Sequence, residues 1–127
     1  MKYGYKKQSK KNFKETIESV KKNLATEGFG VLTEIDVQAV LKKKLDINYI
    51  SYVILGACNP NFAYKALEAE KDIGLLLPCN VIIYESEEGV YISAIKPSIA
   101  MSMVENESLH VIAKDVEQKL ENVINNS

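Results

Sequence analysis

The sequence lacks arginine altogether, so lysine supplies all sixteen of its basic side chains. Seventeen acidic residues balance them, and the formal net charge at pH 7 is -1. Arginine is the side chain best suited to bidentate capture of phosphate, carboxylate or guanine, and a balanced chain has no overall field to attract polyanions. The composition therefore predicts no nucleic-acid partner and no electrostatic attachment to a membrane.

Signals for export, membrane insertion and disulfide bonding are also scarce. The segment from Met1 to Lys11 is basic and polar, and no long apolar run follows it, so neither a secretory signal nor a membrane span is expected there. The two cysteines, Cys58 and Cys79, are too few for a disulfide scaffold. We expect a soluble protein of the cytoplasm in which both cysteines are thiols.

Apolar periodicity divides the chain into helices and strands of a single domain over residues 1–127, since this length supplies one ordinary core. Helical spacing follows Ser9, Asp36 and Asn59, which are all good N-terminal caps, and it returns from Leu109 to Val123. Strands are expected over residues 3–7, 29–35, 49–57, 81–84 and 90–95, the last two as an antiparallel hairpin. The predicted fold class is α+β, with a compact single-layer sheet, mixed or antiparallel, that is covered by helices including a C-terminal one.

Two apolar segments carry more specific expectations. Residues 49–57 show no clear alternation, which is typical of a strand covered on both faces, and we place this strand centrally in the sheet. After Pro97, the segment 99–104 contains the flexible side chains Met101 and Met103. It is either a lid or contact surface, or a helical turn packed on the core, and the second arrangement is the more common one.

Most familiar catalytic and cofactor motifs are missing. The chain has no glycine-rich phosphate loop, no paired cysteines at metal-ligand spacing and no serine-centred nucleophile elbow. Its one histidine, His110, lies at the start of the last helix without an identifiable catalytic partner. A zinc site built from Cys58, Cys79 and His110 would lack a fourth ligand. We therefore predict no metal and no cofactor.

The most distinctive feature is a pair of nearly mirrored motifs, CNP over residues 58–60 and PCN over residues 78–80. Asparagine caps helices well and proline suits the first helical position, so a helix is expected to begin at Asn59. The free amides of that helix would favour a thiolate on Cys58. The alternative is that both cysteines fill space in the core, which is their commoner role.

Other polar residues have ordinary structural interpretations beside the functional ones. Thr33 and Asp36 stand where a strand gives way to a helix, a place where sheets often build binding sites, although Asp36 also fits a helix cap. Residues 42–44 are three lysines at the end of the same helix, where cations complement the helix dipole.

Four segments of the sequence form a pattern when they are taken in order: GFGVLTEIDVQA at 28–39, LGACNP at 55–60, LLPCNV at 76–81 and SAIKP at 93–97. Together they resemble the family known as domain of unknown function 302. The resemblance implies a compact α+β domain of bacteria and archaea that pairs as a homodimer and has no assigned reaction. The residues that match its signature are Thr33, Asp36, Cys58, Asn59, Pro60, Pro78, Cys79 and Asn80. Asp46 departs from the pattern, because a glycine is expected to end the short helix there.

Three hypotheses about function remain open. The first is a module that binds an unknown small molecule in a pocket bordered by Thr33, Asp36, Cys58, Asn59, Cys79 and Asn80, since strand ends and helix N-termini concentrate unpaired polar groups. The second is a thiol-dependent redox enzyme that uses Cys58, with Cys79 as a resolving partner. The third is a structural homodimerising domain whose motifs serve only turns and packing. The apolar segment around Met101 and Met103, which a small monomer would struggle to cover, favours a homodimer without specifying its surface.

The placement of the two cysteines discriminates most strongly between these hypotheses. Tandem, closely spaced cysteines would have favoured the redox enzyme, and their absence favours binding over catalysis. A disulfide requires Cα atoms within about 7 Å of each other. A larger separation of Cys58 from Cys79 would therefore exclude an intramolecular redox pair.

Overall fold

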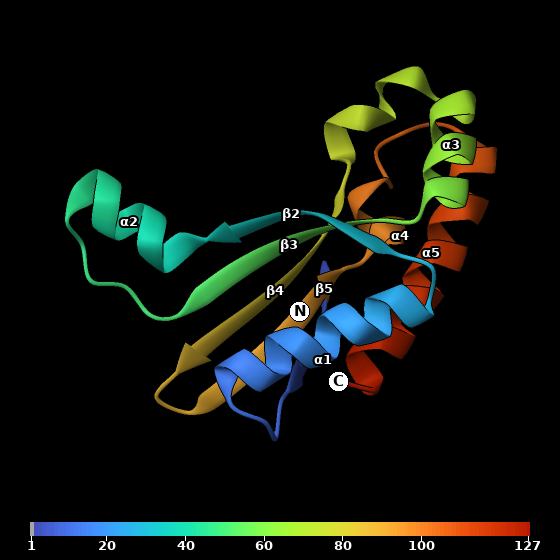
Figure 1. Cartoon of the computed structure of the whole chain (residues 1–127). Coiled ribbons are helices and arrows are strands. Elements are labelled where there is room, and N and C mark those ends of the chain that lie inside the picture. Colours follow the sequence, from blue (N-terminus) through green and yellow to red (C-terminus); the bar gives the residue numbers. More distant parts are fainter. Residues whose placement is uncertain (1) are drawn as a thin grey trace.

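The structure, a computed structural model, describes residues 2–127. In this part of the chain, five strands form one antiparallel sheet in the order β1-β5-β4-β3-β2 (Figure 1). The strands are β1 (Gly4–Gln8), β2 (Gly30–Asp36), β3 (Tyr52–Cys58), β4 (Cys79–Ser86) and β5 (Gly89–Ile95). The helices are α1 (Phe13–Thr26), α2 (Val37–Leu45), α3 (Pro60–Ala69), α4 (Pro97–Ala100) and α5 (Glu107–Asn125), with the short 3-10 helix η1 (Lys71–Leu76). The α+β class and the C-terminal helix predicted from the sequence are confirmed.

The main core lies between one face of the sheet and the helices α1 and α5 (Figure 1). Strand side chains enter it at every second position, and helix side chains enter it from the apolar stripe of each helix. Each fully buried aliphatic side chain contributes roughly 1.5–3 kcal/mol relative to an exposed one. The fully buried side chains of this core include Val20, Leu24, Leu55, Val81, Ile83, Ile92, Leu120, Val123 and Ile124.

Two predictions about the strand over residues 49–57 are wrong: its burial on both faces and its place in the middle of the sheet. Buried residues of β3 alternate with the half-buried Tyr52 and Ile54, so β3 is not covered equally on both faces. Tyr52 stacks on Tyr84 and Tyr84 on Tyr91, with ring centroids 5.5 and 5.6 Å apart. Because Tyr52 and Ile54 on the less covered face are also large apolar side chains, residues 49–57 show no clear alternation in the sequence. β3 is also not the middle strand, because β4 occupies that position.

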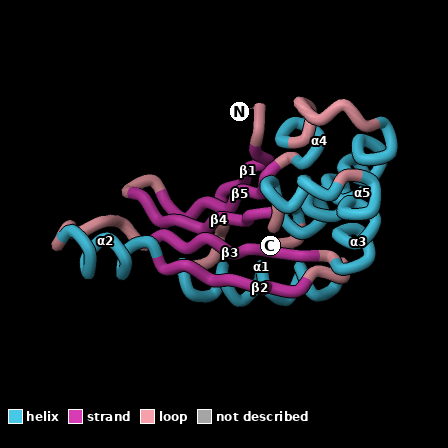
Figure 2. The backbone as a smooth tube through the Cα atoms, turned by 90° about the horizontal axis from the view of Figure 1, so that it is seen from above, coloured by secondary structure: helices cyan, strands magenta, loops and turns pink. Residues whose placement is uncertain are grey.

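Residues 30–50 comprise β2, α2 and most of the loop that leads to β3, and we call them the β2–α2 arm. Both views place α2 beyond the ends of β4 and β5, away from the other helices (Figures 1 and 2). No residue of α2 is buried, and β2 is the edge strand of the sheet. The exposed large apolar side chains of the arm are Leu32, Ile35, Val40, Leu45, Ile47, Tyr49 and Ile50.

The N-terminal cap predicted from the sequence is correct for α2 and wrong for α1. The Asp36 carboxylate accepts a hydrogen bond from the Ala39 amide at 2.9 Å and caps α2. Asp46 ends this helix in the left-handed conformation, with φ 53°. Aspartate tolerates that conformation better than most residues, so the turn is the one a glycine would make. The cap of α1 is Asn12 and not Ser9, because the buried Ser9 hydroxyl pairs with Thr16 instead.

The β4–β5 hairpin and the segment after Pro97 both form locally in the chain. The hairpin of β4 and β5 is confirmed, with a turn shorter than expected because the strands continue to Ser86 and Gly89. The segment after Pro97 is a helical turn on the core, where Met101 is only 5% exposed and packs with Leu109. Met103, by contrast, is 73% exposed. None of the helices within residues 2–127 is long and apolar enough to cross a membrane.

Candidate functional site

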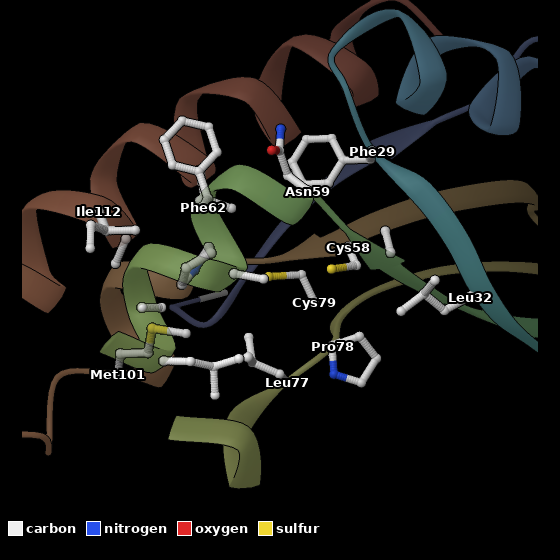
Figure 3. A pocket seen from close by; sticks show the side chains of 17 residues that line it. Phe29, Leu32, Cys58, Asn59, Phe62, Leu77, Pro78, Cys79, Met101 and Ile112 are labelled. Atoms are coloured by element: carbon white, nitrogen blue, oxygen red, sulfur yellow. The ribbon is translucent and has the colours of Figure 1, made fainter. Parts of the chain in front are cut away.

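An apolar pocket of about 300 Å³ lies where β3 runs into α3 (Figure 3). Its walls are Phe62 from α3 and Ile112 from α5, together with Leu77 and Met101. Leu32, from the β2–α2 arm, contributes one side of it. The apolar stripes of α3 and α5 therefore do not close completely on each other and on the sheet.

Gly56 allows three chain segments to meet beside this pocket. A Cβ atom at position 56 would collide with the Thr33 hydroxyl oxygen of β2 and would lie 2.9 Å from Cγ of Pro78. The missing side chain thus lets Thr33 and Pro78 approach β3 from both neighbouring segments. Because Pro78 also lines the pocket, this contact fixes one rim of the cavity.

Asn59 does not cap α3 through its side chain, which corrects the expectation from the sequence. Its side-chain amide instead donates a hydrogen bond to the Glu27 carbonyl at 3.2 Å. Glu27 follows α1, and the next residue, Gly28, has φ 86°, a conformation that favours glycine. A Cβ atom at Gly28 would lie 3.1 Å from the Asn59 amide nitrogen. Asn59 therefore joins the start of α3 to the end of α1 while it lines the pocket.

The two cysteines line the same pocket, and Figure 3 shows both sulfurs directed into it. Cys58 is half-buried, whereas Cys79 is only 8% exposed. Burial, and to a lesser degree the charge of Cys58, raises the pKa of the Cys79 thiol to about 11. Cys79 is therefore a neutral thiol at physiological pH.

Comparison with known proteins identifies the family. The family described as "Domain of unknown function DUF302" matches residues 5–127. The chain belongs to DUF302. A solved structure with the description "Crystal structure of uncharacterized conserved protein DUF302 from Bacillus stearothermophilus" is similar to it, with a TM-score of 0.93 and 30% sequence identity over 99% of this chain and 98% of that chain. No protein of curated function matches the chain.

The signature residues of this DUF302 chain separate into two groups. Cys58, Asn59 and Cys79 come together at the pocket. Thr33 packs over Gly56, and Asp36 is an exposed helix cap, so neither lines the cavity. Asn80 is exposed beside the buried Cys79 and Val81, and strand alternation places it toward the opposite face of the sheet.

The apolar lining of the pocket could not be predicted from the sequence. Helical spacing in the sequence places Phe62 and Ala66 on one face of α3, and Ile112 and Ala113 on one face of α5. Helical spacing shows which side chains face inward, but it does not show whether the opposing stripes meet. The pocket arises because these stripes leave a cavity between them.

The remaining candidate for chemistry, His110, has a structural partner. Its Nε2 atom lies 2.6 Å from the Val104 carbonyl oxygen, so it ties α5 to the segment that follows α4. Within residues 2–127, no group of three or more histidine, cysteine, aspartate or glutamate side chains is gathered so as to hold a metal ion. The candidate site of this chain is thus an apolar cavity lined by two thiols and one carboxamide among hydrocarbon and thioether side chains.

Proposed function

We propose that this DUF302 domain binds a small, neutral and largely apolar molecule in the pocket between β3, α3 and α5. The observation that supports the proposal is the cavity itself, whose volume of about 300 Å³ lies at the lower end of the range of ligand pockets. Its position at the end of the sheet, between packed helices, is also typical of such sites.

The chemistry of the lining selects the class of ligand. Apart from Asn59 and the two thiols, the described lining side chains are hydrocarbon or thioether groups. A charged ligand group would lose its hydration without gaining a partner, which costs several kcal/mol. Asn59 supplies a polar contact at one rim, and the remaining binding energy comes from apolar burial. A ring or short chain with at most one polar group fits this description.

Nuclear magnetic resonance titration with indole and with benzene tests the proposal. We expect saturable shifts of the Phe62, Ala66 and Ile112 amides, because they belong to the lining. Replacing the half-buried Ala63 by leucine should fill part of the cavity and weaken indole binding by about tenfold, the loss expected when roughly 1.4 kcal/mol of contact energy is removed. The matched control is Ala39→Leu on the exposed α2, which should bind as the wild type does. Shifts spread evenly over the surface, or equal binding by both variants, would contradict the pocket.

A second candidate function, homodimerisation, is supported by the β2–α2 arm. In the described chain β2 pairs only with β3, so one row of its backbone groups faces outward. Such an edge pairs readily with another strand, and a two-fold axis places an antiparallel edge beside its own copy. Pairing of β2 with the β2 of a second copy would also bring the exposed apolar side chains of both arms together.

The oligomeric state and two arm variants test this candidate. Light scattering at tens of micromolar protein should give the mass of a dimer. Ile35→Lys and Leu45→Lys place charge on the apolar arm and should give monomers. Leu75→Lys changes an 87% exposed leucine outside the arm and should leave the dimer intact. A monomeric wild type would reject the candidate, and a dimer insensitive to the arm variants would move the interface elsewhere.

A further inference from the structure

The sheet register places the two cysteines at bridging distance. Ala57 of β3 is directly opposite Cys79 of β4, and Cys58 is the next residue of β3. Opposed Cα atoms are 4.5–5.5 Å apart and one strand residue advances the chain by roughly 3.4 Å, so Cα of Cys58 lies about 6 Å from Cα of Cys79. This separation is within the range that a disulfide spans.

The pocket lies at the end of β3, and both cysteine side chains line it. Neighbouring register positions normally point to opposite faces of a sheet. β3, however, ends at Cys58 and the chain turns into α3 at Pro60. Both thiols consequently line one cavity (Figure 3).

The two sulfurs differ in their exposure to solvent, and we infer from this difference which one reacts first. Cys58 is half-buried and is reachable from the pocket, whereas Cys79 is 8% exposed. Apolar surroundings destabilise a thiolate at Cys79. They do not destabilise a disulfide, because a disulfide is neutral and needs no hydrogen-bond partner. In this cavity a disulfide between Cys58 and Cys79 is therefore more stable than a thiolate at Cys79.

We propose that Cys58 and Cys79 form a thiol–disulfide exchange site for small, neutral, largely apolar disulfides. The proposal deepens the ligand-binding function and rests on it, since the substrate must enter the same pocket. The apolar lining around both thiols selects such a substrate.

The reaction has two exchange steps that balance without a further reagent. Cys58 loses its proton to solvent, and its thiolate attacks one sulfur of the substrate disulfide. The substrate S–S bond breaks, one thiolate leaves and takes up a proton, and a mixed disulfide remains on Cys58. Cys79 then attacks the Cys58 sulfur and gives its proton to the second leaving thiolate. Two electrons pass from the cysteine pair to the substrate, which is released as two thiols, and an added dithiol reverses the process.

The test uses the neutral aromatic disulfide dithiodipyridine on native protein, with thiopyridone absorbance and intact mass as readouts. The wild type should release two equivalents of thiopyridone and lose two hydrogens in mass, and peptide mapping should find Cys58 bonded to Cys79. Cys79→Ala should release one equivalent and keep the thiopyridyl adduct. Cys58→Ser should release thiopyridone at least about tenfold more slowly, because the remaining thiol is buried.

Three results separate the proposal from its alternatives. A wild type that retains two adducts, or that reacts only in denaturant, would overturn the exchange site even if both variants failed to fold. The negatively charged disulfide dithiobis(nitrobenzoate) should react about tenfold more slowly than dithiodipyridine, after division by the rates with free cysteine, because its carboxylates lose hydration in the pocket. Equal normalised rates would remove the assigned substrate class. Indole binding by the wild type reports on the pocket alone, so saturable binding beside absent exchange would retain the ligand-binding function and reject only the thiol chemistry.

Discussion

The middle of the sheet and the β2–α2 arm are built from similar residues, yet they differ completely in burial. In β4 the apolar residues Val81 and Ile83 are inaccessible to solvent beneath α1 and α5. In β2 no residue is buried, and Leu32 is 66% exposed. The apolar residues of β4 stabilise the fold, whereas those of β2 are available to a ligand or a second copy. The same residue types therefore stabilise the core in one strand and remain exposed in the other.

The largest expected difference between the two regions is the response to side-chain truncation. Ile83→Ala leaves a cavity in the core and should lower the free energy of unfolding by about 3–4 kcal/mol. Ile35→Ala in β2 should lower it by no more than about 0.5–1 kcal/mol, because the side chain is already exposed. Urea unfolding at submicromolar protein, where association through the arm is weak, measures both values. Equal losses would show that the arm is as tightly packed as the core.

Gly56 lies where β3 of the sheet meets Thr33 of the arm, and its substitution should have an intermediate effect on the free energy of unfolding. Gly56→Ala should lower the free energy of unfolding by about 2 kcal/mol, since the new Cβ atom collides with Thr33 and crowds Pro78. Combining it with Thr33→Ala should restore about 1 kcal/mol, because one of the two collisions is relieved. A double-mutant cycle by urea unfolding gives the coupling. Strictly additive losses would mean that Thr33 does not pack against β3 as described.

The smallest expected effect compares two helix caps, each of which accepts a hydrogen bond from the backbone amide three residues later. Asn12 caps α1, which packs on the core, and Asp36 caps α2, which does not. Asn12→Ala should lower the global free energy of unfolding by about 1 kcal/mol. Asp36→Ala should leave that value nearly unchanged and instead accelerate amide exchange within α2, which can open locally. Exchange rates followed residue by residue distinguish the two outcomes. A global loss for Asp36→Ala would make the arm part of the cooperative core.

Local signals explain why most of the fold could be predicted from the sequence. The hairpin of β4 and β5 and the long helix α5 follow the two-residue and 3.6-residue periods that define strands and helices. Asp36 caps α2 as expected because a cap needs only the three residues that follow it. Asp46 takes the left-handed conformation that the pattern assigned to a glycine. Each of these features depends on a short stretch of chain.

Features that depend on distant parts of the chain could not be predicted. Asn59 has the same cap propensity as Asn12, but the Glu27 carbonyl, 32 residues away, takes its amide. The exposure of β2 depends on its place at the sheet edge, which its own residues do not specify. The pocket depends on the space left between α3 and α5, whose stripes were both expected to be buried. Of the candidate site, the two thiols and Asn59 could be predicted from local motifs, while the apolar lining depends on the three-dimensional arrangement.

The stacked tyrosines on the open face of the sheet provide an intrinsic spectroscopic signal for the packing of its strands. The chain contains no tryptophan, so its ultraviolet fluorescence comes from its seven tyrosines. Three of them form the ladder of Tyr52, Tyr84 and Tyr91, and the Lys6 ammonium lies 4.9 Å from the Tyr91 ring centroid. Rings held at fixed offsets couple their transitions and give near-ultraviolet circular dichroism, which is lost when side-chain packing loosens. Burial also raises the pKa of Tyr52, so its phenolate appears later in an alkaline titration than that of an exposed tyrosine. The pairing of β3, β4 and β5 is therefore observable in solution without an introduced label.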